Sequence, residues 1–512
     1  MKRRNWVTKK IAAGLATVML ISIMGCGDQR NTDVQQGDAA VMQETDTQKE
    51  ETGKGDTMKG EPVHLVIHSQ IAEQEDMDSV MEALNEYTLK KLNITVEYVF
   101  HGGNYSDKIN VIIASGEEYD ACFTSSWLNS YNANVAKGAF VDIKDMLPEY
   151  APNLLEAIPE WFWEACTIDG GIYGVPNQQI VAVQRGIAWN AEILDALDYD
   201  TEKVKSIADM EEYAQMAYDE YGVKVLECAY SAVALVNGYE LVSDYLSCGA
   251  IKMGDDSASV VNFYETEEWK EHISAIKNLA DKGLFESESA YSGDVKTNLR
   301  NTGKFSFYAG EGLSPGVDAT LSQKYGTEFR TTDIGVDPYV STSSVVATMF
   351  GISATSKHPV ETLQYLELVN TDPYVMNLLA YGIEGKHYNK LEDGKVELIA
   401  DSGYSHGSSW AFGNVFLTYP LSTQDADVWE QTEELNESAE KSPILGFSFD
   451  AEPVKVQIAN VNTVVLEYST LTTGEMPIEE TNAEFIEKLK VAGVDEIIAE
   501  MQRQIDEFLA SK

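Results

Sequence analysis

The sequence predicts an α/β fold built around a mainly parallel sheet. Short apolar runs typical of buried strands alternate with segments whose apolar residues recur at helical spacing, and Gly or Pro marks many of the boundaries. With 44% hydrophobic and 10% aromatic residues over 512 positions, the chain can bury a large core in two or three domain-sized units.

The first folded elements alternate in type. Residues 63–67 form a short apolar run that predicts a buried strand, and apolar side chains from Met77 to Tyr87 fall on one helical face. Strands are predicted at 94–100 and 119–124, with a helix at 105–115 closed by Gly116 between them. This alternation is the main evidence for the α/β class.

The pattern continues towards the C-terminus. An extended run at 181–189 leads into a helix from residue 191, and further strands are predicted at 304–308 and 345–352. The last helix carries an apolar stripe from Val494 to Leu509. The other predicted helices cover residues 201–221, 265–282, 359–370 and 482–491.

The N-terminus has the pattern of an export signal. Basic residues at positions 2–10 precede an apolar run at 11–24, which is too short for a permanent membrane span. The run ends in Gly25-Cys26 and resembles a bacterial lipobox, in which Cys26 receives acyl chains such as palmitate and becomes the new N-terminus. The alternative is an ordinary signal peptide with an incidental Cys.

A polar segment separates this signal from the folded body. Residues 27–61 contain no Phe, Trp, Tyr, Leu or Ile, so they cannot bury enough apolar surface to offset chain entropy. We therefore expect residues 26–61 to form a disordered tether behind a signal peptide at residues 1–25. The folded body is predicted to begin at Pro62.

Charge and cysteine spacing exclude several classes of function. The formal charge is −46, and loss of the five basic residues before position 11 takes it to about −51, which disfavours nucleic acid as a partner. The sequence has no Cys or His spacing typical of a metal site, and no cofactor is predicted. Besides Cys26, the chain has Cys122, Cys166, Cys228 and Cys248, which are expected either as one or two disulfides or as single buried thiols.

The order of motifs resembles the extracellular solute-binding proteins of ABC importers, and more narrowly the carbohydrate-type lipoproteins of Gram-positive bacteria related to LipO. Asp169-Gly170-Gly171-Ile172-Tyr173-Gly174-Val175-Pro176 is similar to a phrase of that family, and a strand ending in Trp189-Asn190 follows it. The resemblance covers the whole chain. Its other elements are the lipobox and tether, Tyr119-Asp120, Thr302-Gly303-Lys304, the stretch from Gly351 to Pro359, and a C-terminal region from Leu445 similar to DUF3502.

The resemblance implies a bilobal, periplasmic-binding-protein-like fold of type II, with two α/β lobes joined by crossing hinge strands. Lobe 1 is expected at residues 62–180 with a return segment at about 335–400. Lobe 2 is expected at 185–330 with the C-terminal region at about 400–512. The implied function is capture of an extracellular solute, an oligosaccharide, and its delivery to permease subunits by a monomer anchored at the outer face of the cell membrane.

Sugar sites combine aromatic rings, which stack on the apolar faces of the sugar, with polar side chains that bind its hydroxyls. The chain has eight Trp and 26 Tyr. For each aromatic candidate the alternative is core packing, and for Arg185 it is an internal salt bridge. The family often carries Trp where Glu311 to Leu313 stand here. The candidate ligand-binding residues are Asp120, Trp127, Tyr131, Arg185, Trp189, Asn190, Tyr308, Glu311, Tyr404 and Trp410.

No catalytic signature supports an enzyme. HExxH, GxSxG and P-loop motifs are absent from the sequence, and Ser438 to Lys441 match S-x-x-K only in a charge-rich stretch. An acidic cluster from Asp195 to Glu202 lacks the Gly and terminal Glu of a calcium loop. Two alternatives stay open: a glycan-active hydrolase, since 83 acidic residues supply carboxylate pairs, and a glycan-binding surface lipoprotein without a transport partner.

Overall fold

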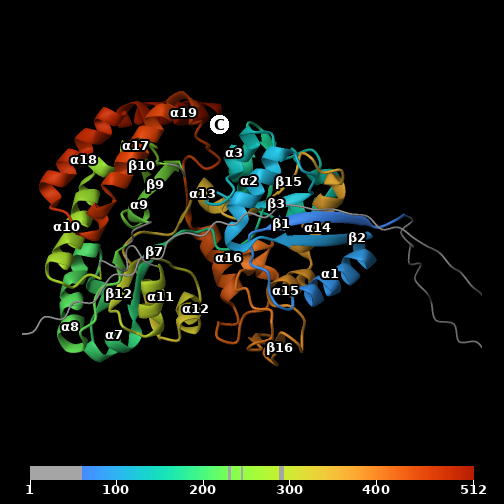
Figure 1. Cartoon of the computed structure of the whole chain (residues 1–512), viewed down its shortest axis with the longest axis horizontal. Coiled ribbons are helices and arrows are strands. Elements are labelled where there is room, and N and C mark those ends of the chain that lie inside the picture. Colours follow the sequence, from blue (N-terminus) through green and yellow to red (C-terminus); the bar gives the residue numbers. More distant parts are fainter. Residues whose placement is uncertain (1–59, 229–231, 244–245, 287–292) are drawn as a thin grey trace, which may run out of the picture. The chain divides into compact units, whose positions relative to one another are not determined.

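The computed structural model describes residues 60–228, 232–243, 246–286 and 293–512 (Figure 1). The predicted signal peptide, Cys26 and nearly all of the predicted tether lie outside these residues. The described body has two lobes, each with its own sheets and hydrophobic cores.

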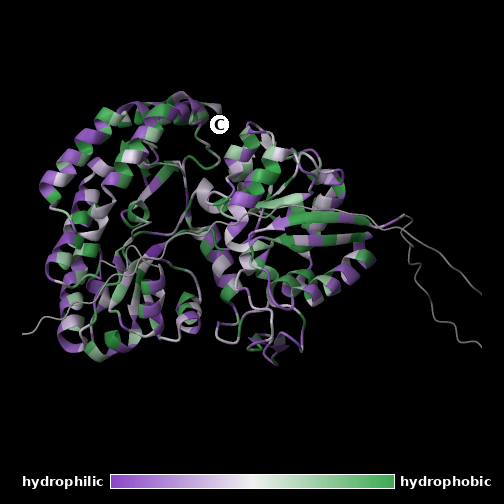
Figure 2. Cartoon of the chain, viewed as in Figure 1, coloured by the Kyte–Doolittle hydropathy of each residue, from purple (hydrophilic) through white to green (hydrophobic). Residues whose placement is uncertain are grey.

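The first lobe is a five-stranded sheet covered by helices (Figure 1). Its strand order is β2 (Ile94–Phe100), β1 (Val63–Ser69), β3 (Ala121–Thr124), β15 (Met349–Ile352) and β6 (Val175–Pro176). The central strands of this sheet are largely hydrophobic, whereas the helices around it alternate between hydrophobic and hydrophilic residues (Figure 2). The helices of this lobe are α1 (Met77–Leu92), α2 (Tyr105–Ser115), α3 (Tyr131–Ala136), α4 (Leu147–Tyr150), α5 (Pro152–Ala157), α6 (Glu160–Cys166), α13 (Thr342–Val345), α14 (Pro359–Thr371), α15 (Pro373–Tyr381) and α16 (Val428–Ser438).

The second lobe contains a four-stranded sheet and a three-stranded sheet. The first has the order β13 (Phe329–Asp333), β7 (Arg185–Asn190), β12 (Phe307–Gly312) and β8 (Glu227–Cys228). The second has the order β11 (Val261–Asn262), β10 (Leu246–Lys252) and β9 (Tyr239–Ser243). Their helices are α7 (Ala191–Leu197), α8 (Glu211–Tyr221), α9 (Val233–Val236), α10 (Glu267–Asp281), α11 (Gly293–Asn301), α12 (Val317–Tyr325), α17 (Lys455–Glu467), α18 (Ile478–Ala492) and α19 (Val494–Ser511).

The chain crosses between the lobes three times. The first crossing, around Val183, forms a β-bridge with Tyr339 of the second crossing. The second and third crossings pair as β14 (Tyr339–Val340) and β18 (Glu440–Lys441). Backbone pairing therefore binds the three crossings into one bundle.

The strand directions differ from the prediction of a mainly parallel sheet. The pairs β1–β2 and β1–β3 are parallel, but β15 is antiparallel to both of its neighbours. In the second lobe, β7 is antiparallel to β12 and to β13. The physical reason is that β15 enters the first sheet from the other lobe, so its direction is set by a long-range crossing that local periodicity does not encode.

Two boundaries also differ from the predicted ones. The strand predicted to begin at Val345 starts only at Met349, as β15, because Val345 is the last residue of helix α13, which Ser341 caps. Tyr404, Ala411, Phe412 and Val415 belong to the core of the first lobe, and Trp410 and Leu435 pack against it. The segment at 400–435 therefore lies on lobe 1, and only the chain after the third crossing packs with the second lobe.

The four described cysteines are buried free thiols, as one of the two alternatives predicted. Burial raises the pKa of Cys122 to about 12 and that of Cys248 to about 11, so both stay protonated near neutral pH. Among the described residues, no helix combines the length and apolarity that crossing a membrane requires.

Trp189 lies at the centre of one core of the second lobe. Its side chain is 0% exposed, packs against Tyr213 and Phe307, and donates from Nε1 to Thr332 Oγ1 over 2.9 Å. Trp189→Ala should therefore lower the free energy of unfolding by about 3–5 kcal/mol, because a large buried ring is replaced by a cavity. Denaturant unfolding measures this cost. The exposed Trp127→Ala should cost less than about 1 kcal/mol, and equal costs for the two variants would contradict the assignment.

His272 makes the stability of this lobe depend on pH. It is 2% exposed, and burial lowers its pKa from 6.5 to about 4. The unfolded chain binds this proton as the pH falls below 6.5, whereas the folded chain binds it only near pH 4, so stability is lost as the pH falls through this window.

His272→Phe should therefore weaken the fall in melting temperature between pH 6.5 and 4.5. Asn237 Nδ2, which lies 3.2 Å from His272 Nδ1, keeps its bond to the Val233 carbonyl in this variant. The exposed His64→Gln serves as the control for the loss of a histidine outside the core. Identical profiles for the original chain and His272→Phe would contradict the expectation.

Candidate functional site

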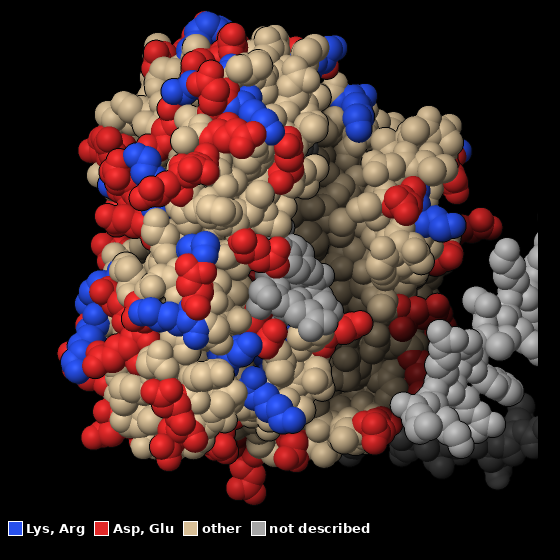
Figure 3. Space-filling view, turned by 60° about the vertical axis from the view of Figure 1, so that its left-hand side comes forward, with Lys and Arg blue, Asp and Glu red and all other residues tan. Residues whose placement is uncertain are grey.

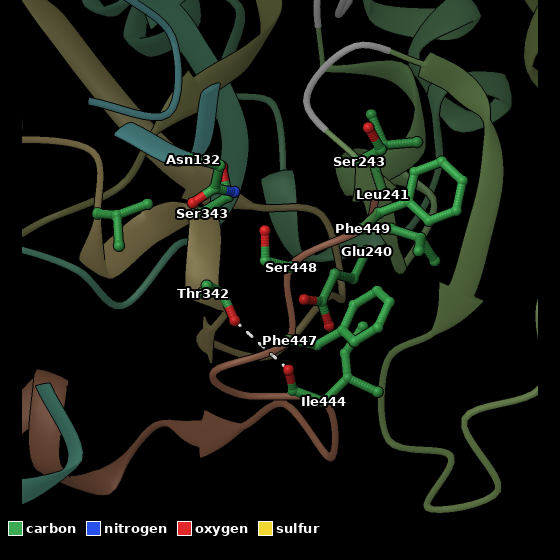
Figure 4. Close-up of a pocket in the computed structure, with 12 residues that line it drawn as sticks. Asn132, Glu240, Leu241, Ser243, Thr342, Ser343, Ile444, Phe447, Ser448 and Phe449 are labelled. Carbon is green, nitrogen blue, oxygen red and sulfur yellow. Dashed lines mark hydrogen bonds between the residues drawn. The ribbon is translucent and has the colours of Figure 1, made fainter. Parts of the chain in front are cut away.

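A pocket lies where the two lobes meet at the crossings (Figure 4). Asn132 and Ser343 come from the first lobe, and Glu240, Leu241 and Ser243 come from β9 of the second. Hydroxyl, amide and carboxylate groups alternate with apolar side chains on its wall. The complete lining is Asn132, Glu240, Leu241, Val242, Ser243, Thr342, Ser343, Val346, Ile444, Phe447, Ser448 and Phe449.

Glu240 fixes this pocket to the crossings. Its Oε2 accepts hydrogen bonds from the hydroxyls of Tyr339, over 2.9 Å, and Ser442, over 2.6 Å. Burial, and then the neighbouring carboxylate, raises the pKa of Tyr339 well above its usual range, so its hydroxyl remains a donor. Thr342 adds a hydrogen bond to the carbonyl of Ile444 (Figure 4).

Next to the pocket, the first lobe presents an aromatic surface formed by Trp127 and Trp410. Trp127 is 58% exposed, and its indole Nε1 donates to the Ala347 carbonyl over 2.8 Å. Its ring centroid lies 6.2 Å from that of Trp410 and 6.1 Å from that of Phe123. The indole ring is thus held in place while much of it faces solvent.

The loop that carries Trp127 borders the pocket directly. Ser126 bonds to the backbone carbonyls of Ser343 and Val346, two residues of the pocket wall. The Trp410 carbonyl accepts from Asn177, just before the first crossing. The aromatic surface and the pocket therefore share one wall, the segment after the second crossing.

Three other predicted site residues of the first lobe are part of its framework. Asp120 accepts from the Val66 amide and the Ser356 hydroxyl. Tyr131 and Tyr404 are buried and donate to the carbonyls of Cys166 and Leu379. These contacts satisfy the polar atoms internally, so the structure gives all three residues a packing role.

Trp189 and Asn190 also have packing roles in place of the predicted contact with a ligand. The ring of Trp189 is enclosed in the core of the second lobe. Asn190 caps α7 by accepting from the Ile193 amide, and it donates to the Gly303 carbonyl. The sequence cannot separate Trp189 from Trp127, because each ring lies at or just after the end of an apolar run.

The remaining predicted residues lie on strands β7 and β12 of the four-stranded sheet. Tyr308 is buried and donates to Glu311 Oε2 over 2.6 Å. Arg185 lies on the adjacent strand, paired with Gly312. Within the described chain no carboxylate lies in ion-pair contact with Arg185, although the charge of Glu311 partly offsets the lowering of its pKa by burial.

Sequence reasoning missed most of the pocket wall. Phe447 and Phe449 alternate along the third crossing, and this alternation was the available signal. Glu240 and Asn132 had none, because their role depends on partners far away in the sequence. In the described part of the chain, no group of three or more His, Cys, Asp or Glu side chains is placed to hold a metal ion.

Comparison with solved structures supports the same fold. The N-glycan transport solute binding protein NgtS from Streptococcus pneumoniae superposes with a TM-score of 0.79 at 24% identity, over 88% of this chain and 99% of that one. Its complex with Man5GlcNAc gives a TM-score of 0.68 at 25% identity, over the same shares. The predicted bilobal fold of type II is confirmed.

Comparison with known sequences identifies relatives of the same kind. A carbohydrate ABC transporter substrate-binding protein of Streptococcus pneumoniae is 26% identical over 99% of this chain and its own full length. The polygalacturonan/rhamnogalacturonan-binding protein YtcQ of Bacillus subtilis is 24% identical over 56% of this chain and 59% of its own. These relatives are described as binding proteins.

Two family matches divide the chain. Residues 443–510 match the domain of unknown function DUF3502, which confirms the resemblance of the C-terminal region. Residues 72–376, more than half of the chain, match the bacterial extracellular solute-binding proteins. The chain therefore belongs to the bacterial extracellular solute-binding protein family.

Proposed function

We propose that this protein is the substrate-binding component of an ABC importer and that it captures an oligosaccharide outside the cell. The exposed and immobilised ring of Trp127 carries the proposal. Burying a large, exposed apolar ring contributes most to the binding free energy when the ring is already rigid, because little conformational entropy is then lost. The C–H face of a sugar can bury such a ring by stacking on it.

The surroundings of Trp127 support this ligand class. Trp410 extends the aromatic surface, and the pocket beside it offers the amide of Asn132 and the hydroxyl of Ser343. Figure 3 shows a hollow in one face of the body whose visible floor is largely free of charged side chains, although Asp and Glu dominate the outer surface. A neutral, hydroxyl-rich ligand fits such a floor better than an ion does.

The relatives point in the same direction. NgtS is described as an N-glycan transport protein, and YtcQ as a binder of polygalacturonan and rhamnogalacturonan. We infer that the chain has no catalytic role, acts as a monomer and passes its ligand to permease subunits. Two lobes joined by paired crossings are typical of proteins that close around a ligand by a hinge motion. A permease could recognise the closed, ligand-bound shape.

Trp127→Ala should weaken oligosaccharide binding about 10- to 100-fold, because the lost contact with the ring is worth about 1.5–3 kcal/mol. Isothermal titration calorimetry with a ligand found by thermal-shift screening of neutral and acidic oligosaccharides measures the change. Trp127→Phe keeps an aromatic face and should lose less. Tyr221→Ala, which removes an exposed ring from α8, is the matched control and should bind like the original chain.

Three results would contradict parts of this proposal. Unchanged affinity in Trp127→Ala would remove the aromatic surface from the binding site. Steady release of product from a glycan, without stabilisation of the protein by any saccharide, would favour the hydrolase alternative. A glycan-binding lipoprotein without a transport partner would bind equally well but would fail to associate with permease subunits.

We further propose that Cys26 anchors the protein to the outer face of the cell membrane. Covalent acyl chains contribute about 0.8 kcal/mol per buried methylene, so a multiply acylated Cys binds the membrane firmly. A flexible tether over residues 26–61 would give a root-mean-square reach of roughly 30–35 Å, which suits delivery to a membrane partner.

Cys26→Ala should release the protein from cells into the medium. In a Gram-positive host fed with labelled palmitate, the original chain should carry label and partition into detergent, whereas the variant should do neither. The purified variant should keep its affinity for saccharide, since the body is unchanged. Release of the original chain without label would instead indicate an ordinary signal peptide.

A further inference from the structure

The segments that form the candidate site lack charged side chains, although 23% of all residues in the chain are charged. Trp127 and Trp410 each lie in such a segment, and two others supply much of the pocket wall. Burial in the core accounts for only part of this pattern, because Trp127 is exposed. The segments without Asp, Glu, Lys or Arg cover residues 121–136, 338–356, 402–424 and 442–449.

Glu240 is the one charged residue in the described lining of the pocket. Figure 4 shows its side chain directed among the other lining residues. The described lining contains no Lys, Arg or His, and Arg185, the cation among the predicted site residues, is not part of it. The internal segments outside the described residues, 229–231, 244–245 and 287–292, contain no Lys, Arg or His either. The pocket wall is therefore neutral except for one carboxylate.

Hydrogen bonding favours the ionised form of Glu240. Its Oε2 accepts from the hydroxyls of both Tyr339 and Ser442. Donors of this kind stabilise the negative charge of a carboxylate. Because both donors are neutral, they hold the charge in place without cancelling it. The wall therefore carries a fixed negative charge on the side of the second lobe.

The remaining polar groups of the wall suit a neutral sugar. They are four hydroxyls and one amide, from Ser243, Thr342, Ser343, Ser448 and Asn132. Hydroxyl and amide groups can both donate and accept hydrogen bonds, and so can the hydroxyls of a sugar. A neutral sugar can therefore replace water at this wall without burying a charge.

An acidic sugar would meet two penalties at the same wall. Its carboxylate would lose water without gaining a cation from the described lining, and burying a charge without such compensation is costly. The carboxylate would also approach Glu240, and like charges brought together across an interface oppose binding. Neither penalty applies to a neutral sugar.

We propose that the site selects neutral oligosaccharides and that Glu240 makes it reject acidic ones. The inference rests on the proposed function and narrows the ligand to the neutral class of oligosaccharides. Glu240 is thus a specificity-determining residue, because its charge acts on the ligand while its hydrogen bonds hold the crossings together.

The test compares each neutral oligosaccharide with its own acidic derivative by calorimetry. Man5GlcNAc, maltotriose and raffinose are the neutral probes, and the acidic probes are the same sugars after oxidation of their primary hydroxyls to carboxylates, together with trigalacturonate. The original chain should bind its best neutral probe about 100-fold more tightly than the matching acidic derivative. Glu240→Gln should narrow this ratio about tenfold, which corresponds to about 1.4 kcal/mol.

Glu440→Gln is the matched control. It removes the charge of an exposed carboxylate on β18 that lies outside the pocket lining, and it should leave the ratio unchanged. An effect of net charge alone would change the ratio equally in both variants. The side-chain carbonyl of Gln at position 240 can still accept from Tyr339 and Ser442. Melting temperatures within about 2 °C of the original chain show that both variants are folded.

The outcomes separate this inference from the proposed function. If the original chain binds an acidic probe as tightly as its best neutral probe, the inference is overturned while the oligosaccharide function stands. This comparison needs no variant, so it decides even where Glu240→Gln does not fold. An unchanged ratio in folded Glu240→Gln would also overturn the inference. Absence of binding to any saccharide by the original chain would overturn both.

Discussion

A carboxylate buried between the lobes connects the parts of this molecule. Glu240 is 5% exposed, and it accepts hydrogen bonds from Tyr339 on the second crossing and Ser442 on the third. Burying a carboxylate without such donors would cost several kcal/mol, so β9 and these crossings constrain one another. Ser343 and Ile444 follow within a few residues of the bonded positions and line the pocket. The shape of the candidate site therefore depends on this tie.

The first crossing is fixed by a different group. Asn436 on α16 accepts from the amides of Val181 and Ala182 and donates to the Gln179 carbonyl. These three bonds hold the crossing to the first lobe up to Ala182. We therefore expect the first crossing to be able to bend only after Ala182.

Local periodicity predicted much of the fold, because helices such as α2 and α19 carry their signals within their own residues. Strand direction was predicted wrongly, since the orientation of β15 depends on where the chain has travelled before it enters the sheet. The candidate site, too, was predictable only where a signal lies within a short stretch of sequence. Trp127 was among the candidates that its residue type suggested, whereas the partners of Glu240 lie 99 and 202 residues away, beyond any local pattern.

The position of β15 has a consequence for biogenesis. This strand lies between β3 and β6 in the first sheet, yet it is synthesised after all the strands of the second lobe's two sheets. The N-terminal lobe therefore cannot complete its sheet when its first strands emerge from the export machinery, and it must wait for more than 200 further residues after β3. Such a high contact order favours slow folding with exposed strand edges. In newly exported chains of this architecture, the first strands of the N-terminal sheet are thus made well before that sheet can be completed.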